Sequence, residues 1–272
     1  MDSKLFKIKN LVWAIAIAVA LLAVVIGIFI VMFKRYNGET SNYKLDLGKA
    51  EGQDLVEIGE GAGVSRGELK LLKETEMADD SYLDNLYFLV DSTFIDLRNQ
   101  SLVNPDHVWG APNDSLPIGS VTTANIRFKD GSEISVANAA LISKPDILFI
   151  GIGSDGLADV TEEQFVQQYD TLIRDIRSAS ADTVIVCLGL ASITDDYSSP
   201  DGLTITMMSD GNDWVQYVCR DTGAFYLDIG DPIQASAALL SRYAAANGKT
   251  LNKAGLTEVL NLIKTHEIVI IK

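Results

Sequence analysis

The chain has 272 residues, a formal net charge of −15 at neutral pH, two histidines and two cysteines. Residues 1–35 carry a net charge of +4, so the remaining residues carry about −19. An acidic body of this kind repels polyanions, which argues against nucleic acid as a partner and against a surface lying flat on anionic lipid. No cysteine–histidine spacing is typical of a zinc site, and neither a metal nor another cofactor is expected.

The first predicted element is a membrane-spanning helix over residues 11–33. Leu11 to Phe33 contains no charged side chain, and at about 1.5 Å per residue a helix of this length crosses a ~30 Å hydrocarbon layer. The run is longer than the apolar part of a signal peptide and ends in Lys34-Arg35 rather than in small residues, so an uncleaved anchor is expected. Basic residues are in excess before the span, which predicts cytoplasmic residues 1–10 and a single-pass protein of the cell membrane whose C-terminal domain is extracytoplasmic.

Residues 34–77 are rich in glycine and acidic side chains and show little periodicity, which predicts a juxtamembrane stalk. Strand-like pieces such as residues 54–58 could still dock on the following domain. Residues 68–76 are expected to form a short helix.

From residue 78 to 272, apolar runs alternate with amphipathic segments. Strands are predicted at 86–91, 106–110, 146–152, 183–189 and 224–229, a hairpin at 125–134, and helices at 135–143, 161–179, 210–222 and 252–264. A new helical pattern also begins at Phe94, directly after Asp91-Ser92-Thr93. Alternating strands and helices predict an α/β domain with a doubly wound, parallel, five-stranded sheet in a flavodoxin-like three-layer arrangement.

The two cysteines leave two possibilities open. Cys187 lies within an apolar strand-like run, where buried free thiols are the usual state. An exported location would nevertheless permit a disulfide between Cys187 and Cys219.

Ligands of doubly wound sheets bind outside the carboxyl ends of the strands. Those ends are Asp91-Ser92, Gly110, residues 151–155, residues 190–194 and residues 228–231. Ser92 is the candidate nucleophile, because its hydroxyl follows a buried strand and adjoins the N-terminus of a predicted helix. The alternative is that Asp91 or Ser92 only caps that helix.

In order and spacing, these segments resemble the sequence blocks of SGNH (GDSL-type) hydrolases. Residues 81–92 resemble the first block, Trp109-Gly110 the second, residues 150–155 the third and residues 247–252 the last, so that the resemblance covers about residues 78–266. It implies acyl-ester hydrolysis or transfer by Ser92. The oxyanion would be stabilised by the N–H groups of Ser92 and Gly110 and by an asparagine of the third block, in a pocket that includes Ser154.

The chain departs from this family pattern at the positions that carry the chemistry. Val90 replaces the glycine before Asp91, and Gly153 replaces the oxyanion asparagine. Thr250 stands where the family has its histidine base, and Asn247 where it has the aspartate that orients the base. Because threonine cannot act as a general base near neutral pH, the triad is predicted to be degenerate.

Two other arrangements could restore chemistry at Ser92. His107 or His266 could supply the base, although both are better explained as structural residues. Asp91, Asp155, Asp228 and Asp231 could bind Mg²⁺ beside Ser92, although acidic residues at strand ends are also ordinary turn formers and caps.

Three functions therefore remain open. The first is a membrane-anchored SGNH-like domain without triad chemistry that binds a ligand, by family analogy a glycan, or a membrane-protein partner at the cell envelope. The second is an active serine esterase or O-acyl transferase that acts on envelope carbohydrate through Ser92 with an unconventional base. The third is a purely structural subunit of a membrane complex.

Overall fold

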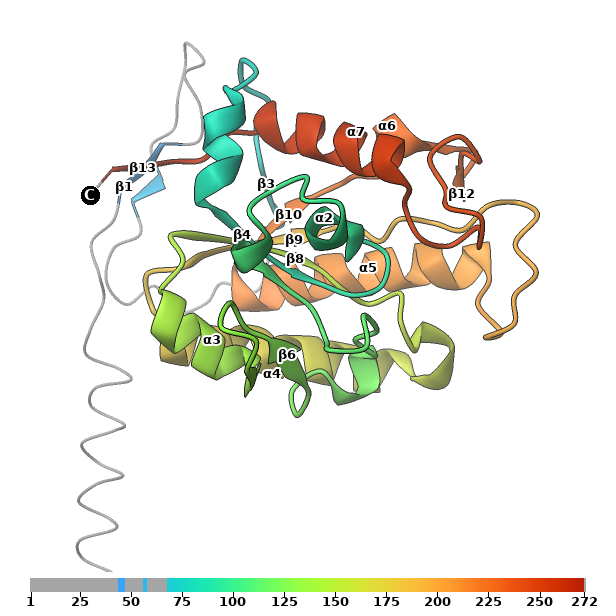
Figure 1. Ribbon diagram of the computed structural model, residues 1–272, viewed down its shortest axis with the longest axis horizontal. Coiled ribbons are helices and arrows are strands. Elements are labelled where there is room, and N and C mark those ends of the chain that lie inside the picture. Colours follow the sequence, from blue (N-terminus) through green and yellow to red (C-terminus); the bar gives the residue numbers. More distant parts are fainter. Residues whose placement is uncertain (1–43, 47–55, 58–67, 272) are drawn as a thin grey trace, which may run out of the picture. The chain divides into compact units, whose positions relative to one another are not determined.

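The computed structural model describes residues 44–46, 56–57 and 68–271 (Figure 1). Among these residues, no helix combines the length and the apolar character needed to cross a bilayer. The predicted span over residues 11–33 lies outside the described residues.

The central element is a parallel sheet of six strands in the order β3-β10-β9-β8-β4-β5. The expected five strands are present as β4 (Leu86–Val90), β5 (Val108–Trp109), β8 (Ile147–Gly151), β9 (Val184–Leu188) and β10 (Phe225–Leu227). The sixth is β3 (Lys70–Leu71), which pairs with β10 at the edge. The prediction of a parallel α/β sheet is confirmed, and the predicted number of strands was one too low.

Helices cover both faces of this sheet, which gives three layers. In Figure 1, α3 (Val136–Ser143) and α4 (Glu162–Ala179) lie on the opposite side of the sheet from α6 (Gly230–Ile233) and α7 (Lys253–Lys264). Side chains alternate along each strand between two buried clusters: Leu148 and Ile150 pack with α4 and α5 (Ile205–Thr222), whereas Phe149 packs with α7. The strands other than β3 therefore bury both faces, as their apolar sequences require, whereas Lys70 and Leu71 of the edge strand β3 are exposed.

The long helices begin where the sequence supplies caps. Thr161 and Gln164 form a capping box at the start of α4, and Asn252 accepts a hydrogen bond from Gly255 N–H at the start of α7. One face of α4 carries the buried side chains of Phe165, Tyr169, Leu172, Ile173 and Ile176. The predicted helical stripe is thus the face that packs on the sheet.

The remaining pairings are short. The predicted hairpin forms as β6 (Asn125–Arg127) and β7 (Glu133–Ser135), and a second hairpin joins β11 (Gln234–Ala235) to β12 (Ala238–Leu239). A separate three-stranded sheet has the order β13-β1-β2, formed by β1 (Lys44–Asp46), β2 (Val56–Glu57) and β13 (Val269–Ile271). Short 3₁₀ turns are η1 (Asp80–Asn85), η2 (Pro105–His107), η3 (Ile118–Ser120) and η4 (Leu157–Asp159).

Three local predictions were wrong. Residues 68–76 contain the edge strand β3 instead of a helix, because strand pairing with β10 outweighs a weak helical pattern. The helix after Ser92 is α2 (Asp96–Asn99), a four-residue turn that begins at Asp96 rather than at Phe94. Asp106 and His107 lie in η2, before the strand to which the sequence had assigned them, because Pro105 starts a turn capped by Asn104.

Candidate functional site

The loops after β4 and β8 meet where the strand order reverses. The chain passes from β4 to β5 on one side and later returns as β8 on the other side of β4. Such a switch point leaves a crevice at the carboxyl ends of the two strands. Asp91-Ser92 follows β4 there, and residues 152–155 follow β8.

The Asp91 side chain connects these two loops through hydrogen bonds. Its carboxylate accepts hydrogen bonds from the N–H groups of Thr93 at 2.9 Å, Gly153 at 3.0 Å, Ser154 at 2.9 Å and Asp155 at 3.3 Å. The side chain is buried, and burial together with the nearby charge of Asp155 raises the pKa of Asp91 to about 6. Asp91 thus fixes the backbone of the site and is not exposed to a ligand.

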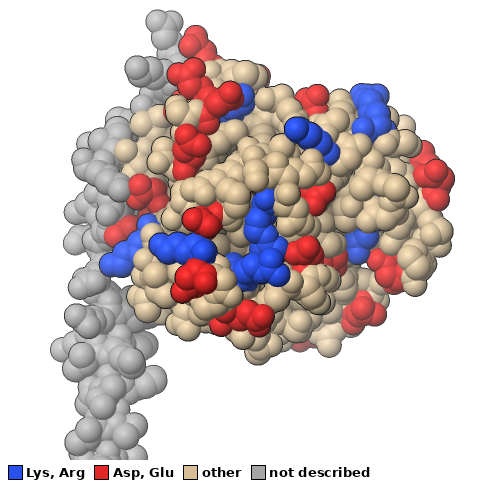
Figure 2. Space-filling model, in the orientation of Figure 1, with Lys and Arg blue, Asp and Glu red and all other residues tan. Residues whose placement is uncertain are grey.

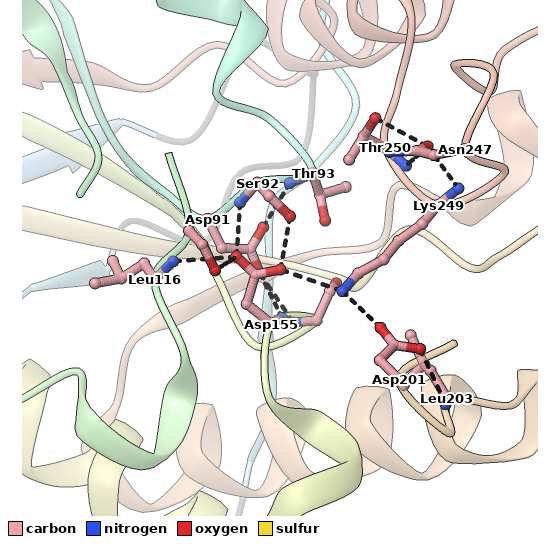
Figure 3. A network of polar contacts seen from close by, with 12 residues as sticks. Asp91, Ser92, Thr93, Leu116, Asp155, Asp201, Leu203, Asn247, Lys249 and Thr250 are labelled. Atoms are coloured by element: carbon pink, nitrogen blue, oxygen red, sulfur yellow. Dashed lines mark hydrogen bonds and ion pairs between the residues drawn. The ribbon is translucent and has the colours of Figure 1, made fainter. Parts of the chain in front are cut away.

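Asp155 is the centre of the polar network drawn in Figure 3. Ser92 donates to it twice, from Oγ to Oδ1 at 2.6 Å and from N–H to Oδ2 at 3.1 Å. Ser115 Oγ and Leu116 N–H, each at 3.0 Å, also donate to Oδ2. Both hydrogens that Ser92 could offer to a substrate oxyanion or to a base are therefore directed at one internal carboxylate.

Lys249 supplies the positive charge of this network. Its Nζ lies 3.2 Å from Asp155 Oδ1 and 3.1 Å from Asp201 Oδ2, between the two carboxylates in Figure 3. Burial lowers the pKa of Lys249, but the two carboxylates outweigh it and the pKa lies above its usual value. Burial likewise raises the pKa of Asp155, but the Ser92 hydrogen bond and the charge of Lys249 outweigh it, so this carboxyl has a lowered pKa and is ionised.

Reasoning from the sequence missed Lys249 and the role of Asp155 as acceptor. A signal for Lys249 was available, because this residue occupies the variable position between Gly248 and Thr250 in the last block. The sequence alone, however, does not predict that Lys249 contacts Asp155, because only the fold brings these two residues together.

Asn247 and Thr250, which stand at the positions of the family's triad aspartate and histidine, form hydrogen bonds within the turn that carries Lys249. Asn247 Oδ1 accepts from the N–H groups of Lys249 and Thr250 at 3.0 Å each and from Thr250 Oγ1 at 3.2 Å. Figure 3 places both side chains apart from Ser92. Their hydrogen bonds shape the loop rather than activate the serine.

The two glycines expected at the oxyanion position have no free space beside them. A Cβ on Gly153, whose φ is +128°, would lie 3.0 Å from Leu190 Cδ2 and 3.1 Å from Phe165 Cε2. A Cβ on Gly110 would meet Ile95 Cδ1 at 2.3 Å. The volume beside Gly153 that a side chain would need is thus occupied by Leu190 and Phe165.

Neither histidine contacts Ser92 in the part of the chain that the structure describes. The His107 ring stacks on Tyr87 with 4.0 Å between ring centroids. His266 Nδ1 lies 2.9 Å from the carbonyl oxygen of Leu262 at the end of α7. The only side chain that hydrogen-bonds the Ser92 hydroxyl in the described residues is that of Asp155.

The acidic residues at the strand ends do not converge on one cation site. Within the described ranges, no three His, Cys, Asp or Glu side chains form a group that could hold a metal ion. Asp228 accepts a hydrogen bond from Gly230 N–H at 2.8 Å, as an ordinary turn residue does.

A cavity of 360 Å³ opens at the carboxyl end of β10. Its polar lining includes three carboxylates and three amides: Asp213, Asp228, Asp231, Asn212, Gln216 and Gln234. Asn212 also accepts from Leu190 N–H at 2.7 Å and donates to the Leu190 carbonyl at 3.2 Å. The backbone of Leu190, whose side chain lies beside Gly153, is therefore hydrogen-bonded to a residue that lines this cavity.

Comparisons with known proteins agree with this arrangement. A model of the GDSL-like lipase/acylhydrolase family matches residues 107–257, more than half of the chain. The match includes Gly110, residues 151–155 and residues 247–252, and begins after Ser92. The comparison with curated proteins found no match.

Solved structures share the fold at low identity. A protein named as a platelet activating factor from Streptococcus pneumonia is 14% identical with a TM-score of 0.50, over 68% of this chain and 88% of that one. An SGNH hydrolase from Slackia heliotrinireducens is 17% identical with a TM-score of 0.48, over 67% and 98% of the two chains. A carbohydrate esterase of family 3 from Talaromyces cellulolyticus is 11% identical with a TM-score of 0.45, over 66% and 94%.

At these identities the structural likeness concerns the fold alone. The match to the family model is independent of the structural likeness and spans three of the four sequence blocks. The chain therefore belongs to the GDSL-like lipase/acylhydrolase family, the SGNH hydrolases.

Proposed function

We propose that this SGNH-hydrolase-like domain binds a ligand without hydrolysing it. The observation that carries the proposal is that Asp155 accepts both the hydroxyl and the backbone N–H of Ser92. A serine hydroxyl becomes a nucleophile only when a base takes its proton. An ionised carboxylate with a lowered pKa, paired with a lysine ammonium, is a weak base for that purpose.

The same carboxylate also opposes transition-state stabilisation. Ester hydrolysis develops negative charge on an oxygen that needs donors already aimed at it. Here the donors from Ser92, Ser115 and Leu116 are directed at Asp155. An approaching oxyanion would meet a negative charge rather than free N–H groups.

The cavity at the end of β10 supports a hydroxyl-rich ligand of glycan type. Its volume of 360 Å³ lies in the usual range for small-molecule sites. Carboxylates and amides accept and donate hydrogen bonds to hydroxyl groups. Among the residues that the structure describes, three carboxylates and no Lys or Arg line it, which favours a neutral or amine-bearing sugar over an anionic one.

The proposal extends to location: the domain is tethered to the cell membrane by a helix over Leu11–Phe33 and acts on the extracytoplasmic side. Support comes from the uncharged apolar run and from the excess of basic residues before it. Protease added to intact cells should then degrade the domain. Protection of the domain in intact cells, with degradation after lysis, would contradict this orientation.

Two measurements on the full chain test the binding function. A fluorophosphonate probe should leave Ser92 unlabelled, and the wild type should not turn over ester substrates faster than the Ser92→Ala variant does.

The second measurement is sugar binding: glucosamine oligomers, or their N-acetylated counterparts, should bind saturably. Asp231→Asn and Gln216→Ala, which change the cavity lining, should weaken that binding about tenfold, the loss expected for a hydrogen bond or two. The matched control Asp210→Asn lies on α5 outside the lining and should bind as the wild type does.

One observation favours a second candidate, an ester hydrolase or acyltransferase. The 2.6 Å separation between Ser92 Oγ and Asp155 Oδ1 is within reach for proton transfer from nucleophile to base. Labelling of Ser92 by the fluorophosphonate, lost in Ser92→Ala, would establish this candidate and overturn the first. Absence of both labelling and sugar binding would leave a structural subunit as the better description.

A further inference from the structure

A second cavity, of 180 Å³, lies beside the edge strand β5 and the hairpin β6–β7. Three basic residues line it: Arg98 from α2, Arg127 from β6 and Lys129 from the hairpin loop. The lining also contains Asp106 and the apolar surfaces of Pro105, Val108 and Phe128. None of these residues takes part in the Ser92–Asp155 network or lines the cavity at the end of β10.

Arg98 is the buried member of the three. Its side chain is only 10% exposed, and Nη2 pairs with Asp114 Oδ1 at 2.6 Å. Nη1 is buried and has no hydrogen-bond partner among the described residues. Because a buried guanidinium N–H without an acceptor is unfavourable, this nitrogen indicates a missing acceptor near the cavity.

Unlike Arg98, the other two cations have no carboxylate partner in the described part of the chain. Arg127 Nη2 donates to the Pro112 carbonyl at 2.9 Å, and Lys129 Nζ lies 5.6 Å from the centroid of the Phe128 ring. Burial lowers the pKa of Arg98, Asp114 opposes this effect, and the like charge of Arg127 adds to it. The guanidinium groups therefore repel each other without a bridging anion.

This concentration of positive charge stands out in a chain of net charge −15. On the face drawn in Figure 2, Lys and Arg side chains gather near the middle, with acidic side chains spread around them. Two guanidinium groups offer planar donor pairs that match the oxygens of a phosphate group, and a lysine adds a further charge.

We propose that this cavity binds a phosphate group. At 180 Å³ it is smaller than the usual ligand site, so it suits a phosphate ion or the terminal phosphate of a larger molecule. The apolar wall of Pro105, Val108 and Phe128 would exclude water from one side of the bound group. The phosphate could come from solution or from a lipid headgroup, and both sources present the same oxygens to Arg98, Arg127 and Lys129.

The test is calorimetric titration of the full chain, in micelles of a neutral detergent, with inorganic phosphate at constant ionic strength. Saturable binding is expected in the wild type, and Arg127→Gln and Lys129→Gln should each weaken it about tenfold, the loss of one charge-assisted hydrogen bond. The matched control Lys253→Gln removes an equal charge from the exposed start of α7 and should bind phosphate normally. Thermal unfolding without phosphate confirms that each variant is folded. Arg98 itself is not substituted, because truncating this buried side chain could destabilise the fold.

A parallel titration with dihexanoyl phosphatidic acid separates the two sources. Tighter binding of the lipid than of inorganic phosphate would assign the site to a headgroup, and the reverse would assign it to a soluble phosphate. The proposal is overturned if the folded wild type does not bind either probe saturably, or if Lys253→Gln weakens binding as much as Arg127→Gln does.

Discussion

At the scale of single residues, Asp155 and Lys249 form an internal ion pair beside Ser92. The carboxylate accepts hydrogen bonds from two segments, Ser92 and Ser115-Leu116, and Lys249 neutralises its charge. A buried charge that loses its partner is strongly destabilising, because its desolvation is then no longer offset. The site therefore depends on Lys249 for stability more than on Ser92.

Lys249→Gln should lower the free energy of unfolding at pH 7 by about 2 kcal/mol, because it leaves Asp155 buried without its cation. Urea denaturation measures the change. Lys264→Gln is the matched control, since its partner Asp80 is 91% exposed and the loss of that pair should have little effect. Equal losses in the two variants would contradict the assigned role of Lys249.

Asp91 gives the protein a defined dependence on pH. Its pKa of about 6 in the folded state lies above the ordinary value of 3.8, so the folded state holds this proton more tightly than the unfolded chain does. The resulting stability is fully present below about pH 4 and is lost as the pH rises through about 6, a contribution on the order of 3 kcal/mol. Asp155, whose pKa is lowered, contributes in the opposite sense: its stabilisation is present above about pH 4 and is lost in more acidic solution.

Urea denaturation at a series of pH values tests this expectation. The free energy of unfolding of Asp91→Asn should lack the decline between about pH 4 and pH 6, whatever its absolute value. The exposed control Asp159→Asn should retain the decline. A wild-type curve with the same slope as that of Asp91→Asn would show that Asp91 does not titrate in this range.

The sequence predicted the site only in part. It identified Ser92, Gly110, Gly153 and the last block by their order along the chain, and the fold brings the loops after β4 and β8 together as expected. It could not predict that Asp155 would accept from Ser92, because that contact depends on a loop closed by four N–H groups on Asp91. Nor could it predict that Leu190 and Phe165 fill the space beside Gly153.

At the scale of elements, buried strands and long amphipathic helices were predictable, whereas short elements were not. The run over residues 146–152 can bury both faces only as a central strand, and β8 has that place. β3 has just two residues, and its conformation is imposed by the neighbouring β10 rather than by its own composition. α2 is also short, with four residues where a helical pattern was expected from Phe94 onward.

The turn of the hairpin β11–β12 has an unfavourable backbone conformation. Its two turn residues, Ser236 and Ala237, both have positive φ, at 49° and 70°. This geometry is typical of a type I′ turn, which favours Asn and Gly. Ala237→Gly should therefore raise the free energy of unfolding by about 1 kcal/mol, measured by urea denaturation. Ala238→Gly, in the buried strand that follows, should lower it. Stabilisation by both changes would contradict the turn assignment.

At the scale of the whole molecule, the small sheet β13-β1-β2 joins the two ends of the described chain. β1 is its central strand and pairs antiparallel with β13, so that Leu45 lies opposite Ile270. The segment that follows the predicted membrane span is thereby hydrogen-bonded to the strand that follows α7. Such a short sheet has few contacts of its own and should open independently of the six-stranded sheet.

Leu45→Pro tests this coupling, because proline removes the backbone N–H of the central strand and breaks the ladder on one side. Hydrogen exchange at the amides of residues 269–271 should accelerate at least about tenfold, while exchange in β8 stays unchanged. The control Leu45→Val keeps the N–H and suits a strand, so its exchange should match that of the wild type. Faster exchange in β8 as well would mean that the two sheets unfold as one cooperative unit. Unchanged exchange at residues 269–271 would mean that β13 is held by contacts other than β1.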